Sequence, residues 1–238
     1  MPSKNTDLAT LDSDMIEAET ETADNLPAQY DALFAAIVQE TKDSLTPAAG
    51  NYIATRNQRF TLPDNTILST LDCIIVDFIR LNVLMPPYQP NVRSGAKCWA
   101  INRKDAELAP GPQVPNPISN VCIGCPNNEF GSHGKGKACT NRIRLIIAPS
   151  DATKDSDVWI VHLAPTTLAE WTNYVKRCER EIGSAGFCRT LTRLSFAPNV
   201  DYTKIQFARI PGARPDPKII MALREKAADV LMLDPPTD

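Results

Sequence analysis

Four cysteines bracket a segment rich in proline and glycine, with the spacing C-x23-C-x2-C-x13-C. They are Cys98, Cys122, Cys125 and Cys139. A tetrahedral set of thiolates favours zinc, and a structural zinc site needs no open coordination position. The pair Cys122 and Cys125, followed by a proline, resembles a zinc knuckle, in which a tight turn lets two sulfurs bind one ion. We therefore predict a structural Zn²⁺ ion held by these four cysteines.

Two other metal sites fit the same residues. His133 could replace Cys98 or Cys139 as a ligand, and four thiolates also suit an iron–sulfur cluster. Disulfides are disfavoured because a cytosol keeps thiols reduced. The three remaining cysteines lie in apolar patterns and are expected to be small buried hydrophobes: Cys73, Cys178 and Cys188.

The sequence offers little for catalysis. Neither His133 nor His162 is followed two residues later by the glutamate that base deaminases require. The segment 131–137 fits G-x4-G-K, but an alanine stands where a phosphate-binding loop needs Ser or Thr, and a strand pattern follows instead of a helix. We expect no enzyme, and we interpret this segment as a flexible basic finger that brings Lys135 and Lys137 to phosphates.

Alternation along the strands collects cations on single faces. Ile143 and Leu145 share one face of their strand, so Arg142 and Arg144 share the other. Neighbouring strands of this kind would form a basic groove that follows a nucleic-acid backbone. We expect phosphate contacts from seven side chains: Lys135, Lys137, Arg142, Arg144, Arg189, Arg193 and Lys204. The alternative is a solvated sheet face.

Three aromatic side chains lie beside these cations and are expected to stack on bases: Trp99, Phe130 and Tyr202. The alternative for each is a place in the core, because large aromatic side chains mostly stabilise a fold by burial.

The elements that must position these residues are short apolar runs separated by Pro, Asn, Asp and Gly. We predict strands at 52–61, 71–84, 96–102, 142–148, 157–163, 187–196 and 202–209, and helices at 166–181 and about 215–231. Several strands, then a helix, then a two-strand hairpin is the element order of an OB-fold, a small Greek-key barrel. We therefore expect a mainly β, OB-like barrel with flanking helices; another α+β sheet is the alternative.

The predicted organisation has four parts. They are an acidic disordered tail at 1–26, a short helical extension at 27–50, the OB-like domain at 51–212 with a zinc-binding insertion at 103–141, and a C-terminal helix with an acidic tail at 213–238. A loop as long as the insertion is uncommon in a folded domain unless something holds it, and the cysteines are the candidate.

The formal net charge of -3 hides an uneven distribution. Residues 1–50 hold ten acidic and two basic side chains, and the last ten residues hold three acidic side chains. The remaining body is left with 23 basic and 15 acidic side chains, a balance of +8. We expect the acidic, partly apolar segment 229–238 to compete with nucleic acid and dock replication proteins; the end of a packed helix is the alternative. We expect a cytoplasmic protein, because no apolar run approaches the roughly 20 residues of a membrane helix.

Five segments together resemble a family of bacteriophage-encoded single-stranded DNA-binding proteins: Ile53–Pro63, Ile75–Phe78, Cys122–Ser132, Gly134–Cys139 and Leu163–Thr167. The resemblance spans about residues 50 to 210, and its cysteine segment is its most specific part. It implies an accessory of phage replication or recombination, akin to zinc-containing OB-fold proteins that coat single strands in the host cytoplasm. The alternative is a zinc-stabilised protein-interaction factor that modulates replication or transcription without touching DNA. A homo-oligomer is compatible with either function.

Overall fold

The strand β4 (Leu71–Leu84) organises the main sheet, because both of its edges are paired. The computed structural model describes residues 51–90, 94–233 and 235. β6 (Thr140–Pro149) pairs with nearly the whole of one edge of β4, while β5 (Cys98–Asn102) and β8 (Leu191–Phe196) pair with opposite ends of the other edge. The sheet is completed by β7 (Trp159–Leu163) beside β6 and β9 (Ile205–Ile210) beside β8, and all of these pairs are antiparallel.

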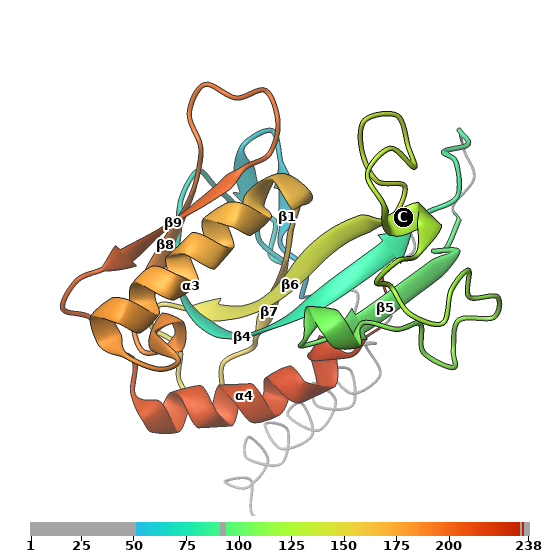
Figure 1. The fold of residues 1–238 in the computed structure, drawn as a ribbon. Coiled ribbons are helices and arrows are strands. Elements are labelled where there is room, and N and C mark those ends of the chain that lie inside the picture. The colour runs from blue at the N-terminus through green and yellow to red at the C-terminus, as the bar shows by residue number, and fades with distance from the viewer. Residues whose placement is uncertain (1–50, 91–93, 234, 236–238) are drawn as a thin grey trace, which may run out of the picture. The chain divides into compact units, whose positions relative to one another are not determined.

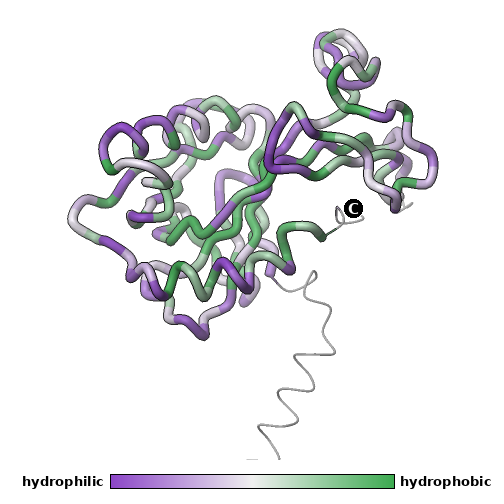
Figure 2. Tube along the Cα trace, turned by 60° about the horizontal axis from the view of Figure 1, so that its bottom comes forward, coloured by the Kyte–Doolittle hydropathy of each residue, from purple (hydrophilic) through white to green (hydrophobic). Residues whose placement is uncertain are grey.

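Two helices cover the two faces of this sheet (Figure 1). α3 (Leu168–Ile182) packs Trp171 and Tyr174 into the core on one face, and α4 (Pro217–Leu231) packs Leu223 and Val230 into the core on the other. The central strands need apolar side chains on both faces, and β4 accordingly reads as a nearly continuous buried run. Figure 2 shows the same pattern as hydrophobic central strands between more hydrophilic helices and turns.

A β-bulge in β4 places a carboxylate under α4. The register shifts between Ile75 and Asp77, and the Asp77 side chain is 4% exposed. Both of its oxygens accept hydrogen bonds from Arg103, each at 2.7 Å, and Arg224 of α4 adds a third at 3.0 Å. Burial alone would raise the pKa of Asp77, but hydrogen bonds from Arg103 and from the Phe78 N–H outweigh it and the pKa is lowered. This ionised carboxylate ties the sheet to α4 and to the start of the insertion.

The outer edge of β9 is occupied by side chains of α3 and of the turn before it. The Ile205 N–H donates to Thr167 Oγ1 at 3.1 Å, and Arg177 donates to the Phe207 carbonyl at 3.0 Å. Among the described strands, no pairing joins β9 to β7.

A second, smaller sheet precedes β4. It consists of β1 (Ala54–Arg56), β2 (Arg59–Thr61) and β3 (Ile67–Leu68), all antiparallel. The sequence predicts a single strand over 52–61, but positive φ angles at Asn57 (50°) and Gln58 (55°) reverse the chain in the middle of it. This reversal lacks the glycine that usually marks such a turn.

The prediction of a mainly β fold with flanking helices is confirmed. Strand 71–84 and both helices are predicted closely, whereas the segment 187–190 is not part of β8, because residues 186–188 form a 3-10 turn (Gly186–Cys188). The predicted tail at 1–26 and extension at 27–50 lie outside the described residues. No helix in the described part of the chain is both long and apolar enough to cross a membrane.

The C-terminal segment packs as a helix end as far as it is described. Val230 and Leu231 are buried, and Leu233 packs against the same core. The packing of Val230, Leu231 and Leu233 is that of the alternative, the end of a packed helix, and the docking of replication proteins by this segment stays a prediction. The last acidic residues, 234 and 238, lie outside the described residues.

Candidate metal centre and nucleic-acid interface

The topology brings the first and last of the four cysteines to one end of β4. Cys98 opens β5 directly opposite Leu84, the last residue of β4. Cys139 comes one residue before β6, whose first residue Thr140 pairs with Val83 on the other edge of β4. Two residues that lie 41 positions apart therefore flank the same strand end. The prediction that they pin both ends of the insertion agrees with this geometry.

The middle pair of cysteines lies in a tight turn. The Cys122 N–H donates to the Leu108 carbonyl at 2.9 Å, and the Cys125 N–H reaches the Cys122 carbonyl at 3.4 Å. Gly124 has φ +73°, a left-handed conformation that favours glycine. The Asn128 side chain then donates to the Cys122 carbonyl at 2.9 Å. Backbone and side-chain hydrogen bonds thus fold this segment so that both sulfurs approach the end of β4.

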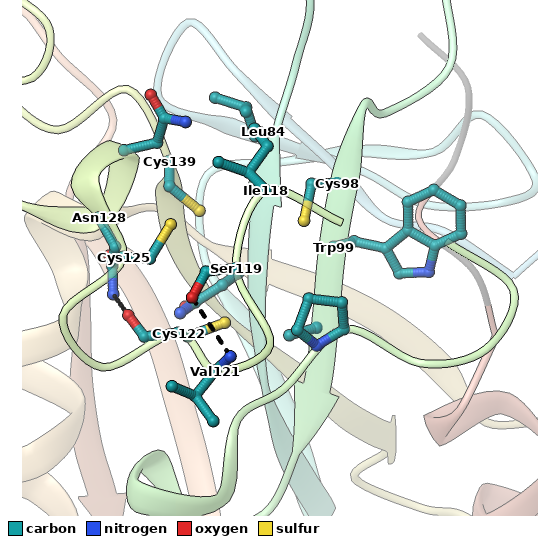
Figure 3. Close-up of a pocket in the computed structure, with 14 residues that line it drawn as sticks. Leu84, Cys98, Trp99, Ile118, Ser119, Val121, Cys122, Cys125, Asn128 and Cys139 are labelled. Atoms are coloured by element: carbon teal, nitrogen blue, oxygen red, sulfur yellow. Dashed lines mark hydrogen bonds between the residues drawn. The ribbon is translucent and has the colours of Figure 1, made fainter. Parts of the chain in front are cut away.

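All four cysteines line a single small pocket of about 20 Å³ (Figure 3). Their labelled sulfurs point into it, from β5, from the turn and from the residue before β6. The four are free thiols. Burial, followed by the neighbouring cysteines, raises the pKa of Cys139 to about 12, and burial raises the pKa of Cys122 as well. Both shifts favour the protonated thiols of Cys122 and Cys139, and a bound cation would favour their thiolates.

The donor set and its surroundings suit a thiolate-bound metal. Asn82 is 3% exposed and lies on the wall of the cysteine pocket, and among the described residues its Nδ2 has no hydrogen-bond partner. Its side chain is close enough to Cys122 to lower the pKa of that thiol, the second influence after burial. A thiolate at Cys122 would accept the orphaned N–H of Asn82. However, in the described residues no group of three or more His, Cys, Asp or Glu side chains already has the arrangement of a metal site, so zinc stays a prediction.

His133 does not line the cysteine pocket. It is exposed near the tip of the finger, where it forms a bridge with Gly136. The structure therefore offers no support for His133 as a replacement ligand. Cys73 and Cys178 are buried in the core under α3, and Cys188 in the core under α4, as expected for small hydrophobes.

A larger pocket of about 520 Å³ lies next to the cysteine pocket, and we call it the groove. Among the predicted site residues, its walls include Phe130, Lys137 and Arg142. The Lys137 ammonium lies 5.0 Å from the Phe130 ring centroid, and Phe130 is 80% exposed. An exposed ring with a cation above it is a suitable stacking platform for a base. Arg80 adds a third cation to the walls.

The groove and the cysteine pocket share part of their walls. Asn82 and Cys139 line both of them. Lys135 lies at the exposed tip of the finger, which closes on itself through hydrogen bonds between His133 and Gly136. The finger follows directly from the cysteine turn, so its position relative to the groove depends on the same cysteines.

The prediction that Arg144 contacts phosphates is wrong, because this side chain is not accessible to solvent. Its side chain is fully buried beneath the end of α4, where it donates to the carbonyls of Val230 at 3.2 Å, Leu231 at 2.7 Å and Leu233 at 2.8 Å. It also donates to His162 Nε2 at 3.3 Å. Arg144 does lie opposite the apolar face containing Ile143, but α4 covers that second face. It caps a helix C-terminus instead of facing solvent.

Three other predicted cations lie away from the groove. Arg193 makes a two-pronged ion pair with Asp72, with both distances at 2.6 Å, and Lys204 pairs with Glu170 at 3.0 Å. Arg189 is exposed in the turn before β8. β6 and β8 are not neighbouring strands, because β4 lies between them, so the condition under which the cations of β6, β8 and β9 would form one groove is not met.

The predicted aromatic residues also separate. Tyr202 is 52% exposed in the loop between β8 and β9. Trp99 is half-buried on β5, and Figure 3 shows its indole directed away from the sulfurs. Arg80 and Asn82 are not among the residues predicted from the sequence, although they alternate as polar positions with the apolar residues of β4. That alternation was the available signal.

Comparison with protein-family models, with curated proteins and with solved structures finds no match to this chain.

Proposed function

We propose that this protein binds single-stranded DNA through the groove, without catalysing a reaction, and that a structural zinc ion on the four cysteines holds the insertion in place. The observation that carries the proposal is the composition of the groove: Arg80, Lys137 and Arg142 line it together with the exposed ring of Phe130, and the Lys137 ammonium lies over that ring. Cations that track phosphates, together with an aromatic platform for bases, are the usual means of binding single strands without sequence preference. One acidic side chain, Asp105, also lines the groove.

The strand pairings support an OB-like interpretation of the sheet. Leaving out the short β5, the five strands in chain order are β4, β6, β7, β8 and β9. β4 pairs with β6 and with β8, β6 pairs with β7, and β8 pairs with β9. The helix α3 lies between β7 and β8 in the chain. This is the connectivity of a partly open five-stranded Greek-key barrel. The insertion then occupies the loop between the first two strands, and Tyr202 the loop between the last two. Those two loops are the ones with which OB-folds contact oligonucleotides.

The test is a fluorescence titration of a labelled oligothymidylate at two salt concentrations. We expect salt-dependent binding that weakens in the double variant Lys137→Ala/Arg142→Ala, with the slope of log K against log salt reduced by about 0.7 for each lost phosphate contact. Phe130→Ala should cost about 1–3 kcal/mol of binding free energy through lost stacking. Lys154→Ala is the matched control, because Lys154 is exposed beyond the opposite end of β6.

An absence of binding at low salt, or binding without salt dependence, would overturn this proposal. A second candidate is a zinc-stabilised factor that binds a protein, and one observation favours it. Ile118, Val121 and Ile123 of the insertion are 47%, 53% and 60% exposed. Under that function the titration would show no DNA binding, while Ile123→Ser would abolish association with the partner.

As the resemblance implies, we further propose that the protein acts in replication or recombination of bacteriophage DNA within the host cytoplasm.

A further inference from the structure

The tip of the β1–β2 hairpin presents two unpaired arginines. Arg56 and Arg59 stand directly opposite each other in the strand register, on either side of a two-residue turn. Both are exposed, and no hydrogen bond or ion pair holds either guanidinium within the described residues. Like charges directly opposite each other across two strands are destabilising. The repulsion would be relieved by an anion bound between them.

The turn between these arginines is anchored to the loop that carries Tyr202. Gln58 adopts a left-handed conformation with φ 55°, which is unfavourable for a residue with a long side chain. Its side-chain amide donates to the Val200 carbonyl at 2.6 Å. This bond spans 142 positions of sequence and fixes the hairpin tip beside the β8–β9 loop.

The opposite face of the hairpin is anchored in the core. Phe60 is fully buried, and its ring centroid lies 4.4 Å from that of Phe196 at the end of β8. Successive residues of a strand point to opposite faces, so a buried Phe60 directs Arg59 outward. Two independent contacts therefore hold the hairpin that carries the arginine pair.

A chain of contacts connects this pair with the groove. From Val200 the loop passes through exposed Tyr202 to Thr203, whose carbonyl accepts a hydrogen bond from Thr166 Oγ1 at 2.9 Å. Thr166 lies in the short segment between Pro165 and Leu168, and both of these residues line the groove. Successive contacts thus link the hairpin tip to the β8–β9 loop and that loop to the wall of the groove.

We infer that Arg56 and Arg59 clamp a phosphodiester of the same single strand that occupies the groove, which extends the binding site from the finger across Tyr202 to the hairpin. This inference rests on the proposed function. Guanidinium groups recognise phosphate oxygens with two parallel hydrogen bonds, and two of them can hold one phosphate from both sides. The clamp makes affinity depend on strand length: a short strand fills the groove alone, and a longer one also reaches the arginines.

The experiment compares labelled oligothymidylates of about 6 and about 16 nucleotides, the range that one OB-fold covers. The wild-type protein should bind the longer strand more tightly. Arg56→Ala/Arg59→Ala should lose most of that gain, about tenfold in affinity, and reduce the salt slope for the longer strand by about 1.4. Binding of the short strand should be unchanged. The control is Lys176→Ala/Arg180→Ala, which removes two exposed cations one turn apart on α3 and should retain the gain.

The outcomes separate the two proposals. If the wild-type protein binds both strands and the hairpin variant binds each strand with the affinity of the wild type, the clamp proposal is wrong and the groove proposal stands. If the wild-type protein binds neither strand at low salt, the proposed function itself fails. A thermal unfolding midpoint at or above that of the wild type in the hairpin variant is expected, because the substitution removes a repulsion. A lower midpoint together with equal loss of short-strand binding would show that the arginines only support the fold.

Discussion

The sheet and the cysteine-bearing insertion of this protein differ in what holds them together. The sheet is stabilised by burial: Ile75, Val76, Leu145 and Ile147 are completely inaccessible to solvent. In the insertion between residues 103 and 139, by contrast, only Leu108, Val114 and Cys122 are buried. At about 25 cal/mol for each Å² of buried apolar surface, the insertion has little hydrophobic free energy of its own.

Hydrogen bonds and cysteines replace the missing apolar burial in the insertion. The turn from Cys122 to Asn128 is held mainly by backbone hydrogen bonds. The ion pair between Asp77 and Arg103 secures only the beginning of the insertion. A metal ion on the four cysteines would provide the cross-link that burial does not. The two regions should therefore respond to different perturbations: the insertion to loss of the metal, and the sheet to loss of buried contacts.

The largest effect is expected when the proposed zinc site is destroyed, because the insertion should then lose its order. In Cys125→Ser, or after treatment with a strong chelator, we expect loss of bound zinc and of the ordered finger, because thiolate–zinc binding is worth on the order of 10 kcal/mol. Hydrogen exchange should become fast in residues 103–139 while β4 and β6 stay protected. Cys188→Ala is the control, since this cysteine lies in the core under α4 and should leave the zinc content unchanged.

Elemental analysis decides the identity of the ion. Zinc at one ion per chain supports the proposal, iron with inorganic sulfide would indicate a cluster, and neither metal would remove the argument from the cysteines. Equal loss of protection in β4 and in the insertion would contradict the separation of the two regions.

A smaller effect is expected from the helix cap in the other region. Arg144→Ala leaves two buried carbonyls at the end of α4 and the part-buried carbonyl of Leu233 without their donor, and each buried unsatisfied group costs about 1–3 kcal/mol. We expect a loss of roughly 3–5 kcal/mol in the free energy of unfolding, measured in urea, with zinc content unchanged. Arg193→Ala serves as the control, because its ion pair is exposed and should contribute little. Unchanged stability of Arg144→Ala would show that water replaces the cap.

The smallest effect concerns pH. Burial, followed by the charges of Arg144 and Arg142, lowers the pKa of His162 to about 3. The unfolded chain therefore binds a proton near pH 6.5 that the folded protein does not, and stability should fall as pH decreases below that value, by about 1.4 kcal/mol for each pH unit. The measurement is the urea midpoint between pH 7 and pH 5. His162→Gln retains an acceptor for Arg144 and should flatten this profile; an equally steep profile would assign it to other groups.

Much of the sheet could be predicted because its residues respond to local rules. The apolar run of β4 and the amphipathic pattern of α3 each define one element without reference to the rest of the chain. The meeting of Cys98 with Cys139 was predictable too, since cysteines at both ends of one loop suggest a common ion.

What could not be predicted depends on tertiary packing. Alternation places Arg142 and Arg144 on one face, but it does not reveal that α4 covers that face at Arg144. Similarly, nothing in the sequence near Arg193 indicates that Asp72, 121 positions away, neutralises it. The hairpin reversal at Asn57 and Gln58 was missed because its distant partner at Val200 supplies what a glycine would supply locally.

The occupied outer edge of β9 has a consequence for how neighbouring molecules behave when crowded. An open strand edge recruits strands from other chains, which leads to aggregation. Thr167 and Arg177 already use the Ile205 N–H and the Phe207 carbonyl on this edge. These two backbone groups are therefore not free to pair with a strand of another copy, and crowding of the protein should not lead to pairing through this end of β9.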